Sequence, residues 1–273
     1  MADVILVALT RPETAAALLD AAWRLASLIG NAAINVLAPR DPIQVSALAA
    51  EMLMDEADSV VALREHELER IMALKTAFDR WTADSPEGAR IAHWIEASGG
   101  AAAIIGERGS RADIIVAAQP DEGDRLARQT FNAALFGTGR PVLMVPPGWS
   151  STVIGRCVAI AWRDEKRAVS ALIPALRYLT HPEQVHLLMG VREGAEPPTT
   201  PRILLEHGIR AELHVLPIGS QPFGQTLLDK TQQLSADLLV MGAYAHSPLR
   251  ELILGGVTRY MLTHADLPVL MRH

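Results

Sequence analysis

The chain has 273 residues, of which 49% are hydrophobic and 21% charged, a composition typical of a folded globular protein. Its formal net charge of −6 at pH 7 argues against general nucleic-acid binding, which usually requires a basic surface. A single cysteine, Cys157, excludes an internal disulfide and a zinc cluster built from cysteines. Because Cys157 lies in an apolar run, we expect it to be a buried structural thiol.

The first residues lack the basic start and apolar core of a secretory signal peptide. The longest apolar runs are far shorter than the roughly 20 residues that a helix needs to cross a membrane. We therefore expect a cytoplasmic protein that has no membrane partner.

The first half of the chain alternates short apolar runs with stretches of helical periodicity. A helix is expected from Pro12 to Leu28, and Gly30 is expected to stop it. Strands are expected near residues 3–9, 31–38, 90–96, 112–118 and 141–146.

A segment at about 43–85 has no counterpart in the second half. It contains neither glycine nor proline and carries apolar residues at helical spacing. The pattern predicts one long helix or a helix pair, capped near Ser46. This segment is either an extra core helix or an interaction arm that covers the partner half or a second chain.

The second half repeats the alternation of the first. A helix is expected from about Lys166 to Leu179. Strands are expected near residues 155–162, 184–191, 210–217, 236–242 and 267–272.

Two short motifs occur in both halves. Ala-Asp-Ile-Ile-Val at 112–116 matches Ala-Asp-Leu-Leu-Val at 236–240, and Pro-Val-Leu-Met occurs at both 141–144 and 268–271. The chain therefore has the pattern of a tandem duplication, with one domain at 1–147 and a second at 152–273. Each domain is expected to be α/β, with a five-stranded parallel sheet and helices on both of its faces.

The end of the second half has a loop of distinctive spacing. Gly242 closes an apolar run, two residues lead to Ala245, and nine more lead to Gly255 and Gly256. This spacing resembles the nucleotide loop of universal stress proteins, which has glycines at the first three positions and Ser or Thr at the last. With the repeats, the whole chain resembles a tandem universal stress protein.

The resemblance implies an adenine-nucleotide site, for ATP or AMP, in the second domain. Glycines let backbone N–H groups close on phosphates, and the N-terminus of the following helix favours their charge. Ala245 replaces a family glycine and Gly256 replaces the hydroxyl residue, although Thr258 lies two residues further on. The candidate nucleotide-binding residues are Asp164, Gly242, Ala245, His246, Gly255, Gly256 and Thr258.

Asp164 supports a nucleotide site in the second half, whereas the residues of the first half argue against a matching site there. Asp164 comes just after the first strand of its domain, where the family usually has an Asp that holds the nucleoside. In the first half, Ala118 stands where Gly242 does, carboxylates follow it, and Thr10 and Arg11 replace the Asp. Because carboxylates repel phosphate, we do not expect the first half to bind nucleotide.

The resemblance also implies the architecture and the function. It implies two flavodoxin-like, adenine-nucleotide-hydrolase-like domains whose last strands, Val142–Val145 and Val269–Arg272, meet antiparallel. A homodimer of such tandems is the expected assembly.

We expect a non-enzymatic universal stress response protein for stress-related sensing or protein interaction, without a cofactor, because no catalytic set emerges from the spacing. The alternatives are an ATP- or AMP-binding protein that uses the second domain and, less favoured, an ATP-hydrolysing enzyme. His264 and His273 have no metal-ligand companions at useful spacing, so no metal site is expected.

Overall fold

A computed structural model describes residues 2–40, 57–121, 123–163, 166–177, 182–196, 198–243 and 256–273. The strands are β1 (Asp3–Ala8), β2 (Ala32–Arg40), β3 (Ala92–Ser98), β4 (Ile114–Ala118), β5 (Val142–Val145), β6 (Cys157–Trp162), β7 (Gln184–Val191), β8 (Glu212–Pro217), β9 (Leu238–Gly242) and β10 (Val269–Arg272). The helices are α1 (Pro12–Ile29), α3 (Ala57–Asp84), α4 (Pro86–Ala89), α5 (Ala101–Gly109), α6 (Arg125–Gly137), α7 (Lys166–Leu176), α8 (Arg202–Glu206), α9 (Phe223–Gln233) and α11 (Val257–His264).

All ten strands form one sheet, in the order β3-β2-β1-β4-β5-β10-β9-β6-β7-β8. Neighbouring strands within each half are parallel, and β5 pairs antiparallel with β10 through Val269–Met144, Leu270–Leu143 and Met271–Val142. The second half thus repeats the strand order of the first. The predicted α/β class, the parallel half-sheets and the antiparallel junction are confirmed.

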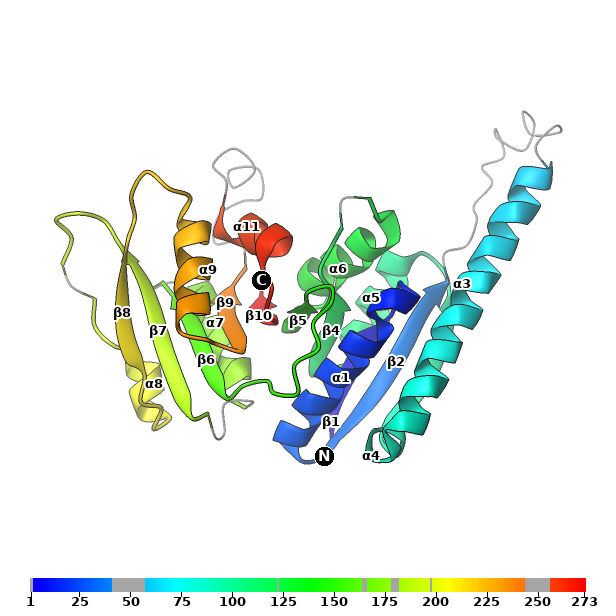
Figure 1. The fold of residues 1–273 in the computed structure, drawn as a ribbon, viewed down its shortest axis with the longest axis horizontal. Coiled ribbons are helices and arrows are strands. Elements are labelled where there is room, and N and C mark those ends of the chain that lie inside the picture. Colours follow the sequence, from blue (N-terminus) through cyan, green and yellow to red (C-terminus); the bar gives the residue numbers. More distant parts are fainter. Residues whose placement is uncertain are drawn as a thin grey trace.

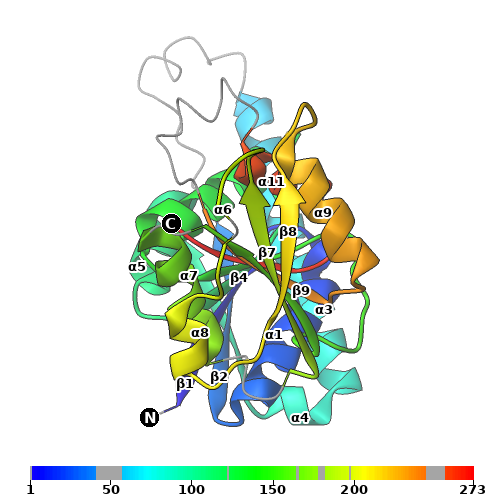
Figure 2. The ribbon, with the colours of Figure 1, turned by 90° about the vertical axis from the view of Figure 1, so that its left-hand side faces the viewer.

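Helices cover both faces of the sheet (Figures 1 and 2). On one face, α1, α7 and α8 pack into a core that runs through both halves. On the other face, α5, α6, α9 and α11 pack into a second core. The central strands β1, β4, β5, β6, β9 and β10 are mostly apolar and buried, as expected for parallel strands that are covered on both sides, whereas the edge strands β3 and β8 are partly exposed.

The first helix shows how local sequence sets an element. Pro12 opens α1 at the position where a missing N–H costs nothing, and the apolar residues at helical spacing are buried against the sheet. Gly30 ends it in the left-handed conformation, with φ 81°, and donates its N–H to the carbonyl of Ala26. The predicted stop at Gly30 is confirmed.

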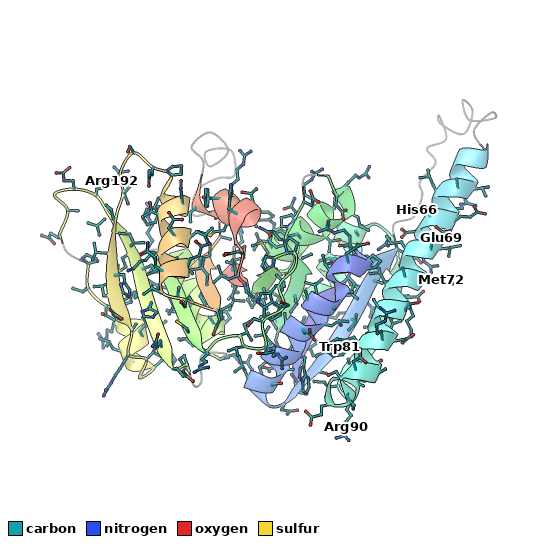
Figure 3. All side chains as sticks on the ribbon, viewed as in Figure 1. His66, Glu69, Met72, Trp81, Arg90 and Arg192 are labelled. Atoms are coloured by element: carbon teal, nitrogen blue, oxygen red, sulfur yellow. The ribbon has the colours of Figure 1, made fainter. Side chains whose placement is uncertain are left out.

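The long helix α3 flanks the first half. Its Ile71, Leu74 and Phe78 are buried in the core that contains α1. The indole N–H of Trp81 donates to Asp20 of α1 at 2.8 Å. Figure 3 shows Trp81 between α3 and α1, and Met72 on the outer side of the helix.

This placement favours the extra core helix over an arm that covers the partner half. Figure 1 shows α3 at the end of the molecule remote from the second half. The predicted cap at Ser46 and the remainder of the segment before Ala57 lie outside the described residues.

The repeated Ala-Asp motif has a structural role in both halves. The Asp237 carboxylate accepts bonds from the backbone N–H groups of Gly155, Arg156 and Cys157, the last at 2.9 Å, where β6 begins. Asp113 likewise accepts from the N–H of Val4 at 2.9 Å, where β1 begins. Each aspartate therefore ties the start of its own strand to the neighbouring strand.

Side chains also join the two halves away from the sheet. Arg177, just after α7, forms an ion pair with Asp3 of β1 at 2.7 Å. In the opposite layer, the amide of Gln119 donates to the Met261 carbonyl of α11 at 3.4 Å, and His273 packs edge-on against Phe136 of α6.

A cavity of about 480 Å³ lies beside Arg177, and Asp113, Arg140 and Arg272 contribute to its lining.

Cys157 is only partly buried, so the expectation of a buried structural thiol is corrected with respect to its burial. Its position at the start of β6 leaves the side chain near the end of the sheet rather than at its centre. The Sγ atom lies 3.5 Å from the Leu234 carbonyl and 3.7 Å from Oε1 of Gln184. Burial raises the pKa of the Cys157 thiol, and the charge of Asp237 adds to this shift.

We expect Asp237→Ala to lower the free energy of unfolding by about 1–3 kcal/mol, because it leaves partly buried backbone donors without an acceptor. Urea unfolding followed by circular dichroism measures the change. Asp229→Ala, at an exposed position on α9, is the control and should have little effect. Equal stability of wild type and Asp237→Ala would contradict the assigned role.

Candidate functional site

The fold creates two topological switch points, one in each half. From β1 the chain crosses to β2 on one side while β4 lies on the other, and β6 is flanked in the same way by β7 and β9. Ligands of open α/β sheets bind outside the carboxyl ends of strands at such points. The two candidate sites are therefore the strand ends of β1 and β4, and those of β6 and β9.

The second-half site contains three of the predicted residues. Gly242 ends β9 and lies beside Arg272 of β10. Gly256 is the N-cap of α11, and Thr258 lies in the first turn of this helix. Gly242 and Gly256 are partly exposed, whereas Thr258 is buried. The other predicted residues, Asp164, Ala245, His246 and Gly255, lie outside the described residues.

The start of α11 has the electrostatics of an anion site. Gly256 has extended backbone angles, φ −60° and ψ 154°, and as a glycine it offers no side chain to cap the helix. The first N–H groups of a helix have no intrahelical acceptor and carry a partial positive charge. A bound anion accepts hydrogen bonds from these N–H groups and balances their partial positive charge.

The corresponding site in the first half is filled by its own side chains. Arg11, which follows β1, forms ion pairs with Asp121 at 3.3 Å and Asp124 at 3.4 Å, beyond the end of β4. Asp124 is also the N-cap of α6, and its carboxylate accepts the N–H of Ala127 at 2.9 Å. An internal carboxylate thus occupies the N-terminus of α6, the kind of position that can otherwise attract an anion.

These charges are visible in the sequence, but their pairing was not predicted from it. Arg11 and Asp121 are 110 residues apart, and only the parallel pairing of β1 with β4 brings them together. The available signal was opposite charge just after two apolar runs that were both predicted to be strands of one sheet.

Trp162 lies at the end of β6 but does not face the candidate site. Its side chain is buried in the core of the α1 and α7 face, together with Ile160 of the same strand. This burial favours a packing role for Trp162 over stacking on a nucleotide base. His264 is engaged locally, since its ring stacks on Tyr260 at 4.1 Å.

Comparison with protein-family models places the second-half site in a known context. Residues 210–273 match the universal stress protein family. This segment contains β8, α9, β9, α11 and β10, and so includes Gly242, Gly256 and Thr258. The predicted resemblance is therefore confirmed for the C-terminal part of the chain. A comparison with curated protein sequences found no match.

Solved structures of universal stress proteins share the fold of the whole chain. One from Archaeoglobus fulgidus DSM 4304 aligns with a TM-score of 0.67 and 15% identity, covering 99% of this chain and 96% of that chain. A putative universal stress protein from Pseudomonas aeruginosa UCBPP-PA14 aligns with a TM-score of 0.57 and 14% identity, covering 99% and 92%. A functionally unknown protein from Pseudomonas aeruginosa PAO1 aligns with a TM-score of 0.56 and 15% identity, covering 99% of this chain and 92% of that chain.

Within the described residues, no helix is both long and apolar enough to cross a membrane.

We expect Asp124→Ala to destabilise the protein by about 1 kcal/mol, because it removes the N-cap of α6 together with one partner of Arg11. Thermal or urea unfolding measures this difference. Asp121→Ala is the matched control, since it removes the other ion pair but leaves the cap, and exposed ion pairs contribute little. A larger loss for Asp121→Ala than for Asp124→Ala would refute this assignment.

Proposed function

We propose that the chain is a non-enzymatic tandem universal stress protein that acts in stress-related sensing or protein interaction. The observation that supports this proposal most directly is the pairing of Arg11 with Asp121 and Asp124 at the first switch point. A site that is filled by its own ion pairs, with its helix already capped, serves as scaffold rather than as a ligand pocket. The repeated strand order and the family match at residues 210–273 support the tandem assignment.

A second candidate function is the binding of ATP or AMP by the second half. The observation that favours it is the contrast between the two helix starts, since the N-cap of α6 is Asp124 and the N-cap of α11 is Gly256. In this proposal the N–H groups at the start of α11 receive a phosphate, and Gly242 lets the backbone approach closely. Asp164, Ala245, His246, Gly255 and Thr258 complete the proposed contacts.

Thermal unfolding with and without millimolar Mg-ATP or Mg-AMP separates these two functions. A nucleotide site of micromolar affinity raises the free energy of unfolding by about 4 kcal/mol at a thousandfold excess over its Kd. The non-binding function predicts no shift of the melting temperature. The nucleotide-binding function predicts a shift that Gly242→Val abolishes.

Two further variants make this test specific. Arg11→Ala alters the first switch point, so it should leave any nucleotide-dependent shift unchanged. Ala245→Gly combined with Gly256→Ser restores the family residues and should create or strengthen affinity. Failure of the double variant to gain affinity would contradict the proposed correspondence with the family loop. Phosphate release above background that disappears in Gly242→Val would instead support the ATP-hydrolysing alternative.

We also propose that two copies of the tandem associate through the outer side of α3. Val61, Leu68 and Met72 are spaced by seven and four residues, which places them on one side of the helix. They are 51%, 49% and 69% exposed, respectively. A second copy that covers this apolar stripe would remove these side chains from water.

We expect Leu68→Glu combined with Met72→Glu to weaken the dimer, because each change would bury a charge in the interface. Sedimentation equilibrium over a range of protein concentrations measures the dissociation constant, which should rise by at least about tenfold. Leu205→Glu, at an exposed apolar position on α8, is the control. A monomeric wild type, or a double variant that dimerises as tightly, would refute this interface.

A further inference from the structure

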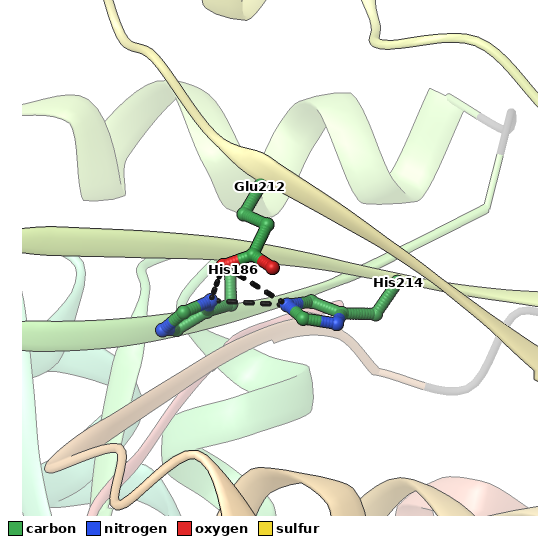
Figure 4. Close-up of side chains that lie close together, drawn as sticks. All are labelled: His186, Glu212 and His214. Carbon is green, nitrogen blue, oxygen red and sulfur yellow. Dashed lines mark hydrogen bonds and ion pairs between the residues drawn. The ribbon is translucent and has the colours of Figure 1, made fainter.

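Two histidines and a glutamate converge at the outer edge of the second half. His186 lies on β7, and Glu212 and His214 lie on β8, the last strand of the sheet. The parallel register places His186 beside Glu212 and Leu188 beside His214. Since side chains alternate along a strand, all three residues project from the same face. Figure 4 shows their polar ends meeting in front of the two strands.

The separations between the polar atoms suit a single tetrahedral ion. Nδ1 of His186 lies 3.1 Å from Nε2 of His214. Oε2 of Glu212 lies 3.4 Å from the first nitrogen and 3.8 Å from the second. Four ligands bonded to zinc at 2.0–2.1 Å are about 3.3 Å from one another, which follows from tetrahedral geometry.

One side of the cluster, formed by the histidines, is mostly buried, and the other side, formed by Glu212, is exposed. The side chains of His186 and His214 are 7% and 13% exposed, whereas that of Glu212 is 69% exposed. Burial lowers the pKa of His214, and Glu212 opposes this shift while Lys230 and His186 add to it. Because Glu212 is mostly exposed, solvent water is available there as a fourth ligand.

We propose that Nδ1 of His186, Nε2 of His214 and Oε2 of Glu212 bind a divalent transition-metal ion of the zinc class. Two imidazoles and one carboxylate, with a fourth position left to water, form a ligand set that zinc uses in proteins. The ion joins the edge strand β8 to its neighbour β7, so metal binding stabilises this end of the sheet. The competing arrangement is a hydrogen bond between the two rings, in which a proton takes the place of the ion.

Titration of the full-length, tag-free protein with Zn²⁺ alone tests the site. Isothermal calorimetry should give one ion per chain, and Zn²⁺ should raise the melting temperature. Co²⁺ should produce the intense visible absorption of a tetrahedral site. Glu212→Gln and His214→Gln should each weaken Zn²⁺ binding by at least about tenfold, the loss seen when even an outer-shell partner of a metal ligand is removed. Glu212 is mostly exposed, so its variant should fold as wild type does.

Two control variants distinguish this site from adventitious binding. His207→Gln removes an exposed histidine elsewhere in the second half, and Cys157→Ser removes the thiol, so both should bind Zn²⁺ as wild type does. Loss of binding confined to Glu212→Gln and His214→Gln supports the proposal. The proposal is overturned, and the hydrogen-bonded histidine pair is left, if wild type does not bind Zn²⁺ or if Glu212→Gln and His214→Gln bind it as tightly as wild type.

Discussion

The antiparallel pairing of β5 with β10 is the contact on which the molecule depends. A five-stranded half-sheet by itself leaves an open row of backbone N–H and C=O groups at this edge, and such edges pair readily with other chains. Here each half covers the edge of the other through a short register centred on Leu143 and Leu270. Both strands are almost completely buried, so the pairing also makes the apolar core on each face of the sheet continuous across the junction.

The same pairing determines how the helical layers meet. It places α1 and α7 on one face and α6 and α11 on the other. As a result, Arg177 reaches Asp3 on the first face and Gln119 reaches the Met261 carbonyl on the second. The contacts between the halves are consequences of the sheet, because each joins elements that the sheet has already brought together.

Equal topology in the two halves does not produce equal chemistry. Both halves place a strand end and a helix start at a switch point, as the strand order requires. In the first half Arg11 pairs with two carboxylates there, and one of them, Asp124, also caps the helix. In the second half the helix begins at Gly256. The fold therefore sets the location of the sites, and a few side chains set the difference between them.

The sequence alone determined the elements and their repetition. Apolar periodicity, the stop at Gly30 and the recurring Ala-Asp and Pro-Val motifs predicted the strands and the parallel half-sheets, because these signals are local or copied from one half to the other. The antiparallel junction was predicted only from the resemblance to tandem universal stress proteins. Tertiary structure alone decided which distant side chains meet. Arg11 joins Asp121 across 110 residues, and His186 joins His214 through the register of β7 and β8. Strand register and helix placement arise from packing of the whole core, so no local pattern contains them.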